Sequence, residues 1–294
     1  MSDGTGPGRW GLADADRAAA LDAALEANVA AAIAEDLGAG DLTGQLLAAD
    51  AEVAARLIVR EPAVLCGSPW FEAVLRRVDG RIRVDWLLAE GALLDGGATV
   101  CQLYGPARGL LTAERSAMNF LQLLSAVATA TRRYVEAIAQ VPGNRAKIVD
   151  TRKTLPGLRL AQKYAVRVGG GYNHRLGLYD AILIKENHIA AAGGIAPALR
   201  AALSKGVPVQ IEVESIDQLE QALAFGAQSV LLDNFTTVAM REAVQVNRGR
   251  ALLEASGGVT LSMVQEIAAT GVDRISIGSL TKDIKAIDYS MRVV

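Results

Sequence analysis

The chain is poor in the residues that most often mark redox, metal and hydrolytic sites. Its 294 residues include only two cysteines and two histidines, and aromatic residues make up 4%. Cys66 and Cys101 are not spaced like a metal knuckle and form no CxxC pair, so we expect two reduced thiols in a cytoplasmic protein. With so few histidines, a His-type metal cluster is excluded, and no Ser-His-Asp pattern indicates a hydrolytic triad.

An excess of charge and a membrane-length apolar run are missing as well. The formal net charge of −2 at pH 7 gives no overall field that would attract nucleic acid or an anionic membrane. The longest uncharged stretch, residues 116–131, contains Asn119 and Gln122 and predicts a buried helix, not a membrane span. The glycine-rich start lacks a signal-peptide core, and we expect residues 1–9 to form a disordered tail on a soluble protein.

Short apolar runs alternate with amphipathic stretches over the second half of the chain. The apolar runs are residues 147–151, 181–185, 209–213, 229–233, 251–256 and 274–278, and the amphipathic stretches include 217–225, 238–246 and 261–270. Apolar strands separated by helices predict a parallel sheet that is buried on both faces. Six units favour an incomplete parallel α/β barrel, and the absence of a GxGxxG after a first strand weakens a dinucleotide-binding fold.

The first part of the chain has a different pattern. Predicted helices cover residues 17–37, 69–78 and 112–140, and predicted strands cover 52–60, 81–87 and 98–104. Separate strands and helices of this kind predict an α+β fold with an antiparallel sheet. We therefore expect an N-terminal α+β sandwich domain over residues 1–125, followed by the α/β barrel over residues 126–294.

Polar residues or glycines follow every predicted strand of the barrel. They are residues 150–154, 185–188, Glu212 and Glu214, Asp233 and Asn234, 256–258, and 278–279. Barrel enzymes carry their chemistry at the carboxyl ends of the strands, where the ends of successive strands meet. The sequence therefore predicts one pocket that is lined by these residues.

The segment that supplies the first side of this pocket is strongly basic. Residues 152–185 contain a single acidic residue, Asp180. Their basic residues are Arg152, Lys153, Arg159, Lys163, Arg167, His174, Arg175 and Lys185. Arg159 and Arg167 fit a solvated helix face equally well. Arginine and lysine at strand ends are suited to a small polyanion, because guanidinium groups match carboxylate and phosphate oxygens. Nucleic acid would need a broader basic face with stacking aromatics.

Carboxylates and glycines supply the other side. Glu212, Glu214 and Asp233 would hold ribose hydroxyls, share a Mg²⁺ ion with a phosphorylated substrate, or form internal salt bridges. Glycines at 257, 258 and 278 let backbone N–H groups approach an anion, as in phosphate sites after the last strands of barrels.

One long segment resembles a known family. The run DTRKTLPGLRLAQKYAVRVGGGYNHRLGLYDAILIKENHI, residues 150–189, is similar to the signature segment of quinolinate phosphoribosyltransferases. The resemblance continues through TAERSAMN at 112–119, IEVE at 211–214, LDNF at 232–235, EASG at 254–257 and GSLT at 278–281. It spans about residues 110 to 294, and its 40-residue core is far more specific than any single glycine-rich loop.

The resemblance implies a set of roles. Quinolinate would lie among Arg152, His174, Arg175 and Lys185, with Thr154 nearby and Arg115 contributed by the other subunit of a homodimer or a higher oligomer. Lys153 would contact the diphosphate, and Glu212 and Asp233 the ribose and Mg²⁺, with Lys153, Lys185, Glu212 and Asp233 as the catalytic groups. The 5′-phosphate would contact Ser256, Gly257, Gly258, Gly278, Ser279 and Leu280.

The implied reaction is phosphoribosyl transfer to quinolinate with decarboxylation, in NAD biosynthesis. A nicotinate phosphoribosyltransferase and a non-catalytic anion-binding relative are the alternatives. The number of cations favours a dicarboxylate over nicotinate, and the intact acidic and basic residues favour an enzyme. In one place the chain departs from the family, since many relatives carry a histidine at or just after the position of Lys282. A role for that histidine is therefore absent here, although Lys282 itself is suited to phosphate.

Overall fold

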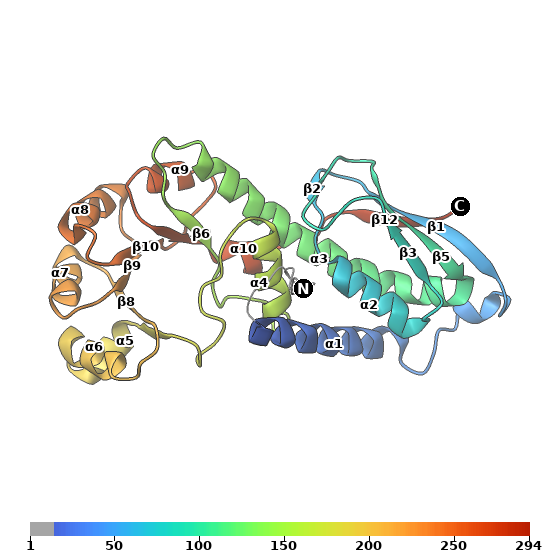
Figure 1. The fold of residues 1–294 in the computed structure, drawn as a ribbon, viewed down its shortest axis with the longest axis horizontal. Helices are drawn as coiled ribbons and strands as arrows, with labels where there is room; N and C mark the ends of the chain where they lie inside the picture. The colour runs from blue at the N-terminus through green and yellow to red at the C-terminus, as the bar shows by residue number, and fades with distance from the viewer. Residues whose placement is uncertain (1–14) are drawn as a thin grey trace, which may run out of the picture. The chain divides into compact units, whose positions relative to one another are not determined.

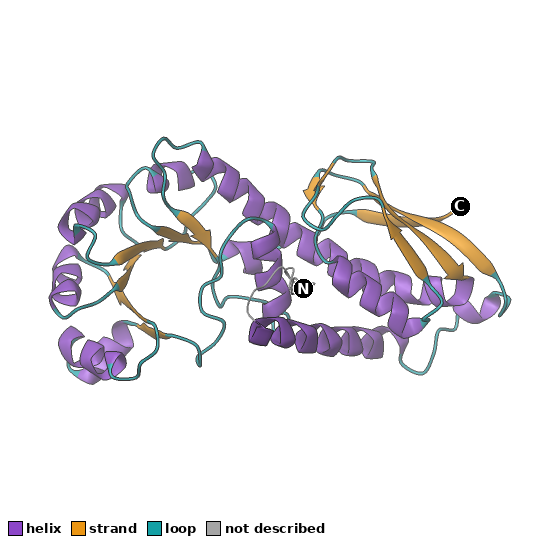
Figure 2. Cartoon of the chain, in the orientation of Figure 1, coloured by secondary structure: helices purple, strands orange, loops and turns teal. Residues whose placement is uncertain are grey.

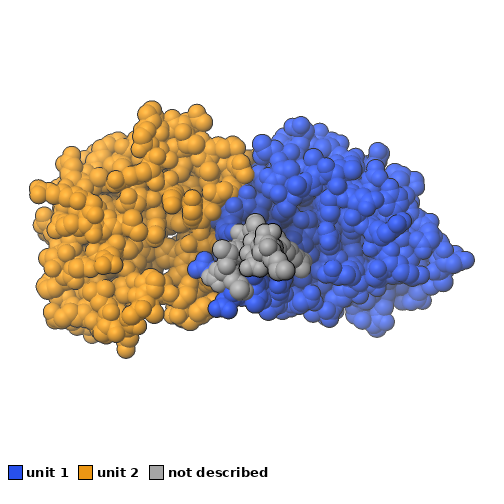
Figure 3. All heavy atoms as spheres, viewed as in Figure 1, with its two compact units in different colours: residues 1–129, 155–168, 284–294 blue, residues 130–154, 169–283 orange. Residues whose placement is uncertain are grey.

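The computed structural model describes residues 15–294, which form two compact units (Figure 3). Unit 1 contains the described part of residues 1–129 together with 155–168 and 284–294, and unit 2 contains 130–154 and 169–283. The tail expected at residues 1–9 lies outside the described residues. We expected the barrel to cover residues 126–294, whereas residues 126–129, 155–168 and 284–294 pack with unit 1.

Unit 1 is built on an antiparallel sheet of four strands in the order β12-β1-β5-β3 (Figure 1). The strands are β1 Glu52–Val59, β3 Arg83–Trp86, β5 Thr99–Pro106 and β12 Tyr289–Val293. Leu57 of β1 pairs with Cys101 on one side and with Met291 on the other. The three strands predicted in this region are present, and β12 is an edge strand that we did not predict. Two further strands, β2 Ala63–Val64 and β4 Leu93–Leu94, form a separate short ladder.

Helices pack on this sheet around one apolar core. They are α1 Ala15–Leu37, η1 Gly44–Leu46, α2 Ser68–Val78, α4 Arg159–Val168 and the first part of α3 Ala107–Ala139. Trp70 and Phe71 of α2 are completely buried. Asn28 of α1 accepts a hydrogen bond from Trp70 Nε1 at 3.3 Å and donates one to the carbonyl of Gly157 at 3.0 Å. The second bond holds the segment before α4 against α1, which explains why residues 155–168 belong to unit 1.

The long helix α3 has 33 residues and corresponds to the helix expected at 112–140, which it extends to Ala107 at its amino-terminal end. It contains Glu114 and Arg115 as well as Arg132 and Arg133. Within residues 15–294, no helix combines the length and the apolar character that crossing a bilayer requires.

Unit 2 is a parallel sheet of six strands in the order β6-β11-β10-β9-β8-β7. The strands are β6 Lys147–Val149, β7 Ile182–Ile184, β8 Val209–Val213, β9 Ser229–Asp233, β10 Leu252–Ser256 and β11 Arg274–Ser276. They coincide with the six predicted strands to within a few residues. β6 and β7 lie at the two ends of this order, so the sheet has the open arrangement of an incomplete α/β barrel.

Helices follow the strands and cover the outside of the curved sheet (Figure 2). They are α5 Glu186–Ala192, α6 Ile195–Leu203, α7 Ile216–Ala224, α8 Thr237–Asn247 and α9 Val264–Ala268, while the short helix α10 Ser279–Lys282 follows β11 and is not part of this outer layer. Side chains of Ser215 and Thr236 cap the first turns of α7 and α8 by accepting backbone N–H bonds. Leu219 and Leu223 of α7 bury their side chains in the core of unit 2, which accounts for the amphipathic pattern of this segment.

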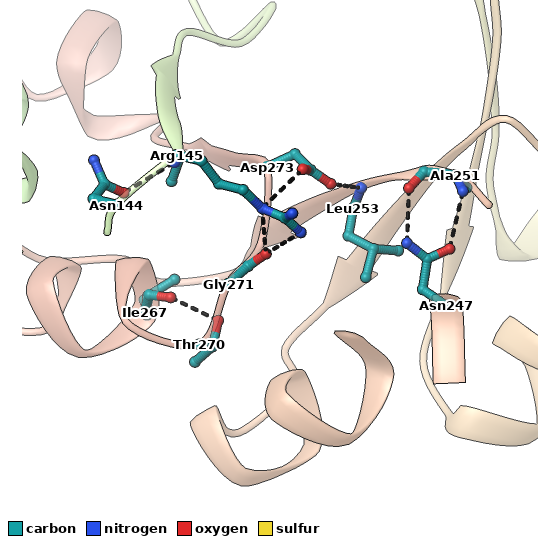
Figure 4. Close-up of polar contacts among 10 residues, drawn as sticks. Asn144, Arg145, Asn247, Ala251, Leu253, Ile267, Thr270, Gly271 and Asp273 are labelled. Atoms are coloured by element: carbon teal, nitrogen blue, oxygen red, sulfur yellow. Dashed lines mark hydrogen bonds and ion pairs between the residues drawn. The ribbon is translucent and has the colours of Figure 1, made fainter. Parts of the chain in front are cut away.

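Polar side chains tie together the amino-terminal ends of β10 and β11 (Figure 4). Asp273 accepts a hydrogen bond from the backbone N–H of Leu253 at 2.8 Å and forms an ion pair with Arg145 at 3.3 Å. Buried Asn247 donates to the carbonyl of Ala251 at 2.8 Å and accepts from its N–H at 3.0 Å. These bonds satisfy backbone groups at the amino-terminal end of the sheet of unit 2. The polar side chains at the carboxyl ends of the strands line a cavity instead.

Candidate active site

A cavity of about 800 Å³ lies at the carboxyl ends of the strands of unit 2. This volume is in the range of sites for small-molecule substrates, roughly 300–1,000 Å³. All residues that line it belong to unit 2. Most of them lie at or after the carboxyl ends of the six strands, and Tyr134 comes from α3, so the single pocket predicted from the polar strand ends is present.

Five cationic side chains gather in this cavity: Arg152, Lys153, Arg175, Lys185 and Lys282. Burial lowers the pKa of Arg175, and the neighbouring charge of Arg152 lowers it further, while Asp180 acts in the opposite direction. Two guanidinium groups that repel each other in a partly buried site would be stabilised by an anion placed between them.

The acidic residues Glu212 and Asp233 line the same cavity from the neighbouring strands β8 and β9. Lys185 Nζ forms an ion pair with Glu212 Oε2 at 3.1 Å, and the Lys185 side chain is half exposed while that of Glu212 is 11% exposed. Asp233 accepts a hydrogen bond from the side-chain amide of Asn234 at 2.8 Å. Glu214 is outside the lining, and its pKa is raised by the nearby charge of Glu186 before any other cause.

The glycine at 257 is required by the way that two loops meet. Gly257 has φ +106°, and a Cβ there would collide with the side chain of Asn234. Asn234 has a positive φ of 57°, and its backbone N–H donates to the carbonyl of Ser256 at 2.9 Å. These contacts bring the backbone after β9 against the backbone after β10, and they leave Gly257 and Gly258 facing the cavity.

Gly278 makes room for a lysine at the last strand. A Cβ at this position would lie 3.2 Å from Cδ of Lys153. The carbonyl of Lys153 accepts a hydrogen bond from Thr281 Oγ1 at 2.8 Å, and its N–H donates to Thr151 Oγ1 at 3.0 Å. Lys153 is therefore held between the loop after β6 and the start of α10.

His174 is held by a chain of polar side chains that crosses the inside of the barrel. His174 Nε2 lies 2.8 Å from Gln210 Oε1, and Gln210 Nε2 donates to Glu254 Oε2 at 3.1 Å. The backbone N–H of Arg175 donates to His174 Nδ1 at 2.8 Å. Asp150, completely buried after β6, accepts the N–H of His174 at 2.8 Å and the side-chain amide of Asn173 at 2.6 Å.

Most residues that the sequence assigned to the site lie together in this cavity. They are Arg152, Lys153, His174, Arg175, Lys185, Glu212, Asp233, Ser256, Gly257, Gly258, Gly278 and Ser279. Thr154 is outside the lining, and its N–H donates to the carbonyl of Arg152. The Leu280 side chain is buried in the core of unit 2, so only its backbone is left for a ligand. Arg115 is exposed on unit 1 and lines a hollow there with Asp41 and Thr112.

Several lining residues are not among the substrate-binding and catalytic residues that the resemblance implies, although Thr151 and Asn234 were expected among the polar strand ends. They are Tyr134, Thr151, Leu183, Leu231, Asn234, Glu254, Val259, Thr260, Ser276, Lys282 and Asp283. Lys282, which we singled out as suited to phosphate, does line the cavity. For Glu254 a signal existed, since it is the one charged residue within the apolar run 251–256.

Cationic groups on one side, carboxylates on the other and glycine loops at the last two strands are features of an enzyme that binds phosphorylated substrates at a barrel's carboxyl ends. The C-terminal domain model of quinolinate phosphoribosyl transferase matches residues 127–292, and the N-terminal domain model matches residues 41–125. The chain therefore belongs to the quinolinate phosphoribosyltransferase family.

Individual relatives agree with this assignment. The nicotinate-nucleotide pyrophosphorylase [carboxylating] of Mycobacterium leprae is 44% identical over 280 residues, which cover 92% of this chain and 97% of the relative. A probable enzyme of the same name from Bacillus subtilis is 40% identical over 262 residues, covering 88% and 90%. The solved nicotinate-nucleotide pyrophosphorylase of Francisella tularensis has a TM-score of 0.89 and 45% identity, covering 93% of this chain and 97% of that one.

Proposed function

We infer that this chain catalyses the reaction that gives its family the name. It transfers the phosphoribosyl group of phosphoribosyl diphosphate to quinolinate, with decarboxylation, and forms nicotinate mononucleotide, diphosphate and CO₂ in de novo NAD biosynthesis. The observation that supports this reaction most directly is the meeting of Arg152, Arg175 and Lys185 with Glu212 and Asp233 in one cavity. Two substrate carboxylates and several phosphates account for more cations than a single phosphate requires.

Quinolinate is proposed to lie at the end of the cavity that follows β6 and β7. Arg152 and Arg175 would hold its two carboxylates, since the two guanidinium groups are close enough for the charge of one to lower the pKa of the other. Lys185 approaches from the end of β7 and His174 from the preceding loop. The 5′-phosphate of the second substrate would lie at the loops after β10 and β11, at Ser256, Gly257, Gly258, Gly278 and Ser279, with the backbone of Leu280.

Magnesium is proposed as the cofactor, and the donors present fit it. Glu212 and Asp233 offer carboxylate oxygens on adjacent strands, and no group of three or more His, Cys, Asp or Glu residues suited to a metal is found within residues 15–294. Mg²⁺ is commonly held by one or two carboxylates, with substrate phosphates and water as its other ligands. When bound, the ion would neutralise charge on the departing diphosphate.

The remaining chemistry is positioning and charge stabilisation by the chain itself. The pyridine nitrogen of quinolinate attacks C1′ as the bond from C1′ to the diphosphate oxygen breaks, through an oxocarbenium-like state. Lys153 would stabilise the leaving diphosphate, and Glu212 and Asp233 the ribose hydroxyls. The bond from C2 to the carboxylate then breaks, CO₂ leaves, and the electron pair stays on C2, where the adjacent positive pyridinium nitrogen stabilises it until C2 takes up a proton.

A homodimer is proposed in which Arg115 completes the site of the partner. Arg115 is exposed on α3, in a hollow of unit 1 where Leu42 and Leu46 are more than four-fifths exposed. Exposed leucines next to an exposed arginine are typical of a protein interface with a polar rim. A cytoplasmic location is proposed because Cys66 and Cys101 are free, buried thiols, as a reducing compartment maintains them.

The activity is tested by incubating the purified chain with quinolinate, phosphoribosyl diphosphate and Mg²⁺, and by following the products with mass spectrometry. We expect nicotinate mononucleotide and CO₂ in equal amounts. Consumption of nicotinate with quinolinate left intact would instead establish the nicotinate reaction, and calorimetric binding of quinolinate without product would establish a non-catalytic relative. For the shared site, Arg115→Ala and Lys153→Ala, each inactive alone, should regain activity when mixed, because some mixed dimers contain one intact pocket.

A further inference from the structure

We infer that Gln210 and Glu254 are positioning residues that hold His174 as a neutral imidazole with its proton on Nε2. In this arrangement His174 fixes the backbone at Arg175 and adds no positive charge to the pocket. The inference deepens the proposed function, because it concerns how the same cavity places the guanidinium group that would meet a substrate carboxylate.

The position of the ring proton follows from the two hydrogen bonds that His174 makes. Nδ1 accepts the backbone N–H of Arg175 at 2.8 Å, and a nitrogen that accepts an N–H bond carries no proton of its own. Nε2 therefore bears the single ring proton and donates it to Gln210 Oε1 at 2.8 Å. Both ring nitrogens are thus committed to partners within the protein.

The orientation of the Gln210 side-chain amide is fixed as well, because reversing the amide would break its hydrogen bonds. Its side-chain nitrogen donates to Glu254 Oε2 at 3.1 Å, and a carboxylate oxygen is the natural partner of an N–H donor. Gln210 is 6% exposed and Glu254 is 1% exposed, so reversing the amide would leave buried polar groups unpaired. The amide oxygen consequently faces His174, and it selects the tautomer that carries its proton on Nε2.

The second carboxylate oxygen of Glu254 indicates that the hydrogen-bonded side chains of His174, Gln210 and Glu254 belong to the cavity and not only to the core. Glu254 Oε1 is buried and has no hydrogen-bond partner within residues 15–294, and Glu254 itself lines the cavity. It lies 3.8 Å from His174 Nε2, too far for a hydrogen bond from a proton already donated to Gln210.

The hydrogen-bonded side chains of His174, Gln210 and Glu254 act on Arg175 through the backbone of Arg175. His174 N–H is anchored to Asp150 at 2.8 Å, and the ring of His174 anchors the next N–H, that of Arg175. Arg175 Nη1 donates to the carbonyl of Ala181 at 3.2 Å, which orients the guanidinium group beside Arg152. A change at Gln210 should therefore reach quinolinate binding through Arg175, while the phosphate end of the cavity stays intact.

The ring proton can be observed directly, because the chain has only two histidines. In a long-range ¹H–¹⁵N spectrum of the full protein labelled at histidine, His188→Gln removes one signal and identifies the other as His174. We expect the neutral pattern with the proton on Nε2. Signals of an imidazolium, or of a proton on Nδ1, would overturn the inference. This measurement needs no turnover, so it is separate from the failure of the proposed reaction, which a product assay of the unchanged protein would reveal.

The positioning role is tested with Gln210→Met, which keeps the side-chain volume and removes both hydrogen bonds. We expect the KM for quinolinate to rise roughly tenfold, the KM for phosphoribosyl diphosphate to stay within about twofold, and the tautomer signals of His174 to become mixed. Glu254→Gln, which keeps an oxygen acceptor, should give a smaller rise and retain the Nε2 proton. Gln265→Met, at an exposed position, is the matched control. An unchanged quinolinate KM in folded Gln210→Met, or an equal rise of both KM values, would rule the role out.

Discussion

Lys185 Nζ lies 3.1 Å from Glu212 Oε2, so the cation at the end of β7 is already paired with a carboxylate at the end of β8. The Lys185 side chain is half exposed, and ion pairs with exposed partners contribute little to stability, on the order of 0–1 kcal/mol. The pair therefore matters for the site, because it holds a cation and a carboxylate next to each other in the lining of the cavity.

Removing this cation should affect turnover far more than folding. For Lys185→Met we expect kcat/KM for quinolinate to fall on the order of 100-fold, since a positioned charge that stabilises substrate and transition state is lost. The melting temperature should change little. Steady-state kinetics and thermal unfolding measure the two effects, and Lys205→Met, on an exposed turn, is the control. A large loss of stability with normal kinetics would contradict the assignment.

Gly257 can be tested against Gly226, a glycine that also has a positive φ but has open space where a Cβ would lie. Ala at either Gly257 or Gly226 meets a positive φ, of +106° and +81°, but only at 257 would the new Cβ collide with Asn234. The strain alone costs about 1–2 kcal/mol. We expect Gly257→Ala also to raise the KM for phosphoribosyl diphosphate, and Gly226→Ala to leave it unchanged. Equal kinetics in the two variants would exclude a role of Gly257 in the phosphate site.

The network at the amino-terminal ends of the strands should act on stability alone. Asn247→Ala removes two hydrogen bonds to Ala251 and leaves buried backbone groups unpaired. We expect unfolding free energy to fall by about 1–3 kcal/mol, with both KM values unchanged. Urea unfolding and steady-state kinetics measure this, with Gln221→Ala on the exposed face of α7 as control. Changed substrate affinity would show that this end is coupled to the cavity.

Asp41 should make the region beside Arg115 sensitive to acid. The backbone N–H of Gly44 lowers the pKa of Asp41 below 3.8, and the hydroxyl of Thr112 lowers it further. Because the folded pKa is lowered, the stabilisation is present above pH 3.8 and is lost as pH falls through the folded value. Asp41→Asn should melt at a lower temperature than the unchanged protein near neutral pH, and the difference should shrink in acid. Asp50→Asn, at an exposed position, should show no such trend.

The barrel strands could be predicted well from the sequence, because each of them is a short, continuous apolar run. The runs at 209–213 and 229–233 became β8 and β9 with unchanged bounds, since buried parallel strands are apolar on both faces. Of the polar residues expected at the pocket from these two strands, Glu212, Asp233 and Asn234 line the cavity, and Glu214 does not. Local patterns therefore suffice where the strand, the turn and the following helix are contiguous in the chain.

The features that were missed depend on partners far away in the sequence. β12 is a strand because residues 289–293 pair with β1, more than 200 residues earlier, and no local pattern announces that pairing. Gln210 reads as an ordinary position in a strand, and its role arises only when Glu254 and His174 are brought to it from elsewhere. The family resemblance assigned a role to His174, whereas the bonds to its two ring nitrogens come from the structure.

The pairing of β12 with β1 also bears on how the protein is made. A ribosome delivers β1, β3 and β5 early, but β12, the fourth strand of their sheet, leaves the exit tunnel only after the strands of the barrel. All six strands of the barrel are synthesised in the interval, so the later unit has its whole sheet while the earlier one still exposes the edge of β1. That edge is open to wrong partners during synthesis, and a nascent chain stalled before residue 289 would carry it permanently.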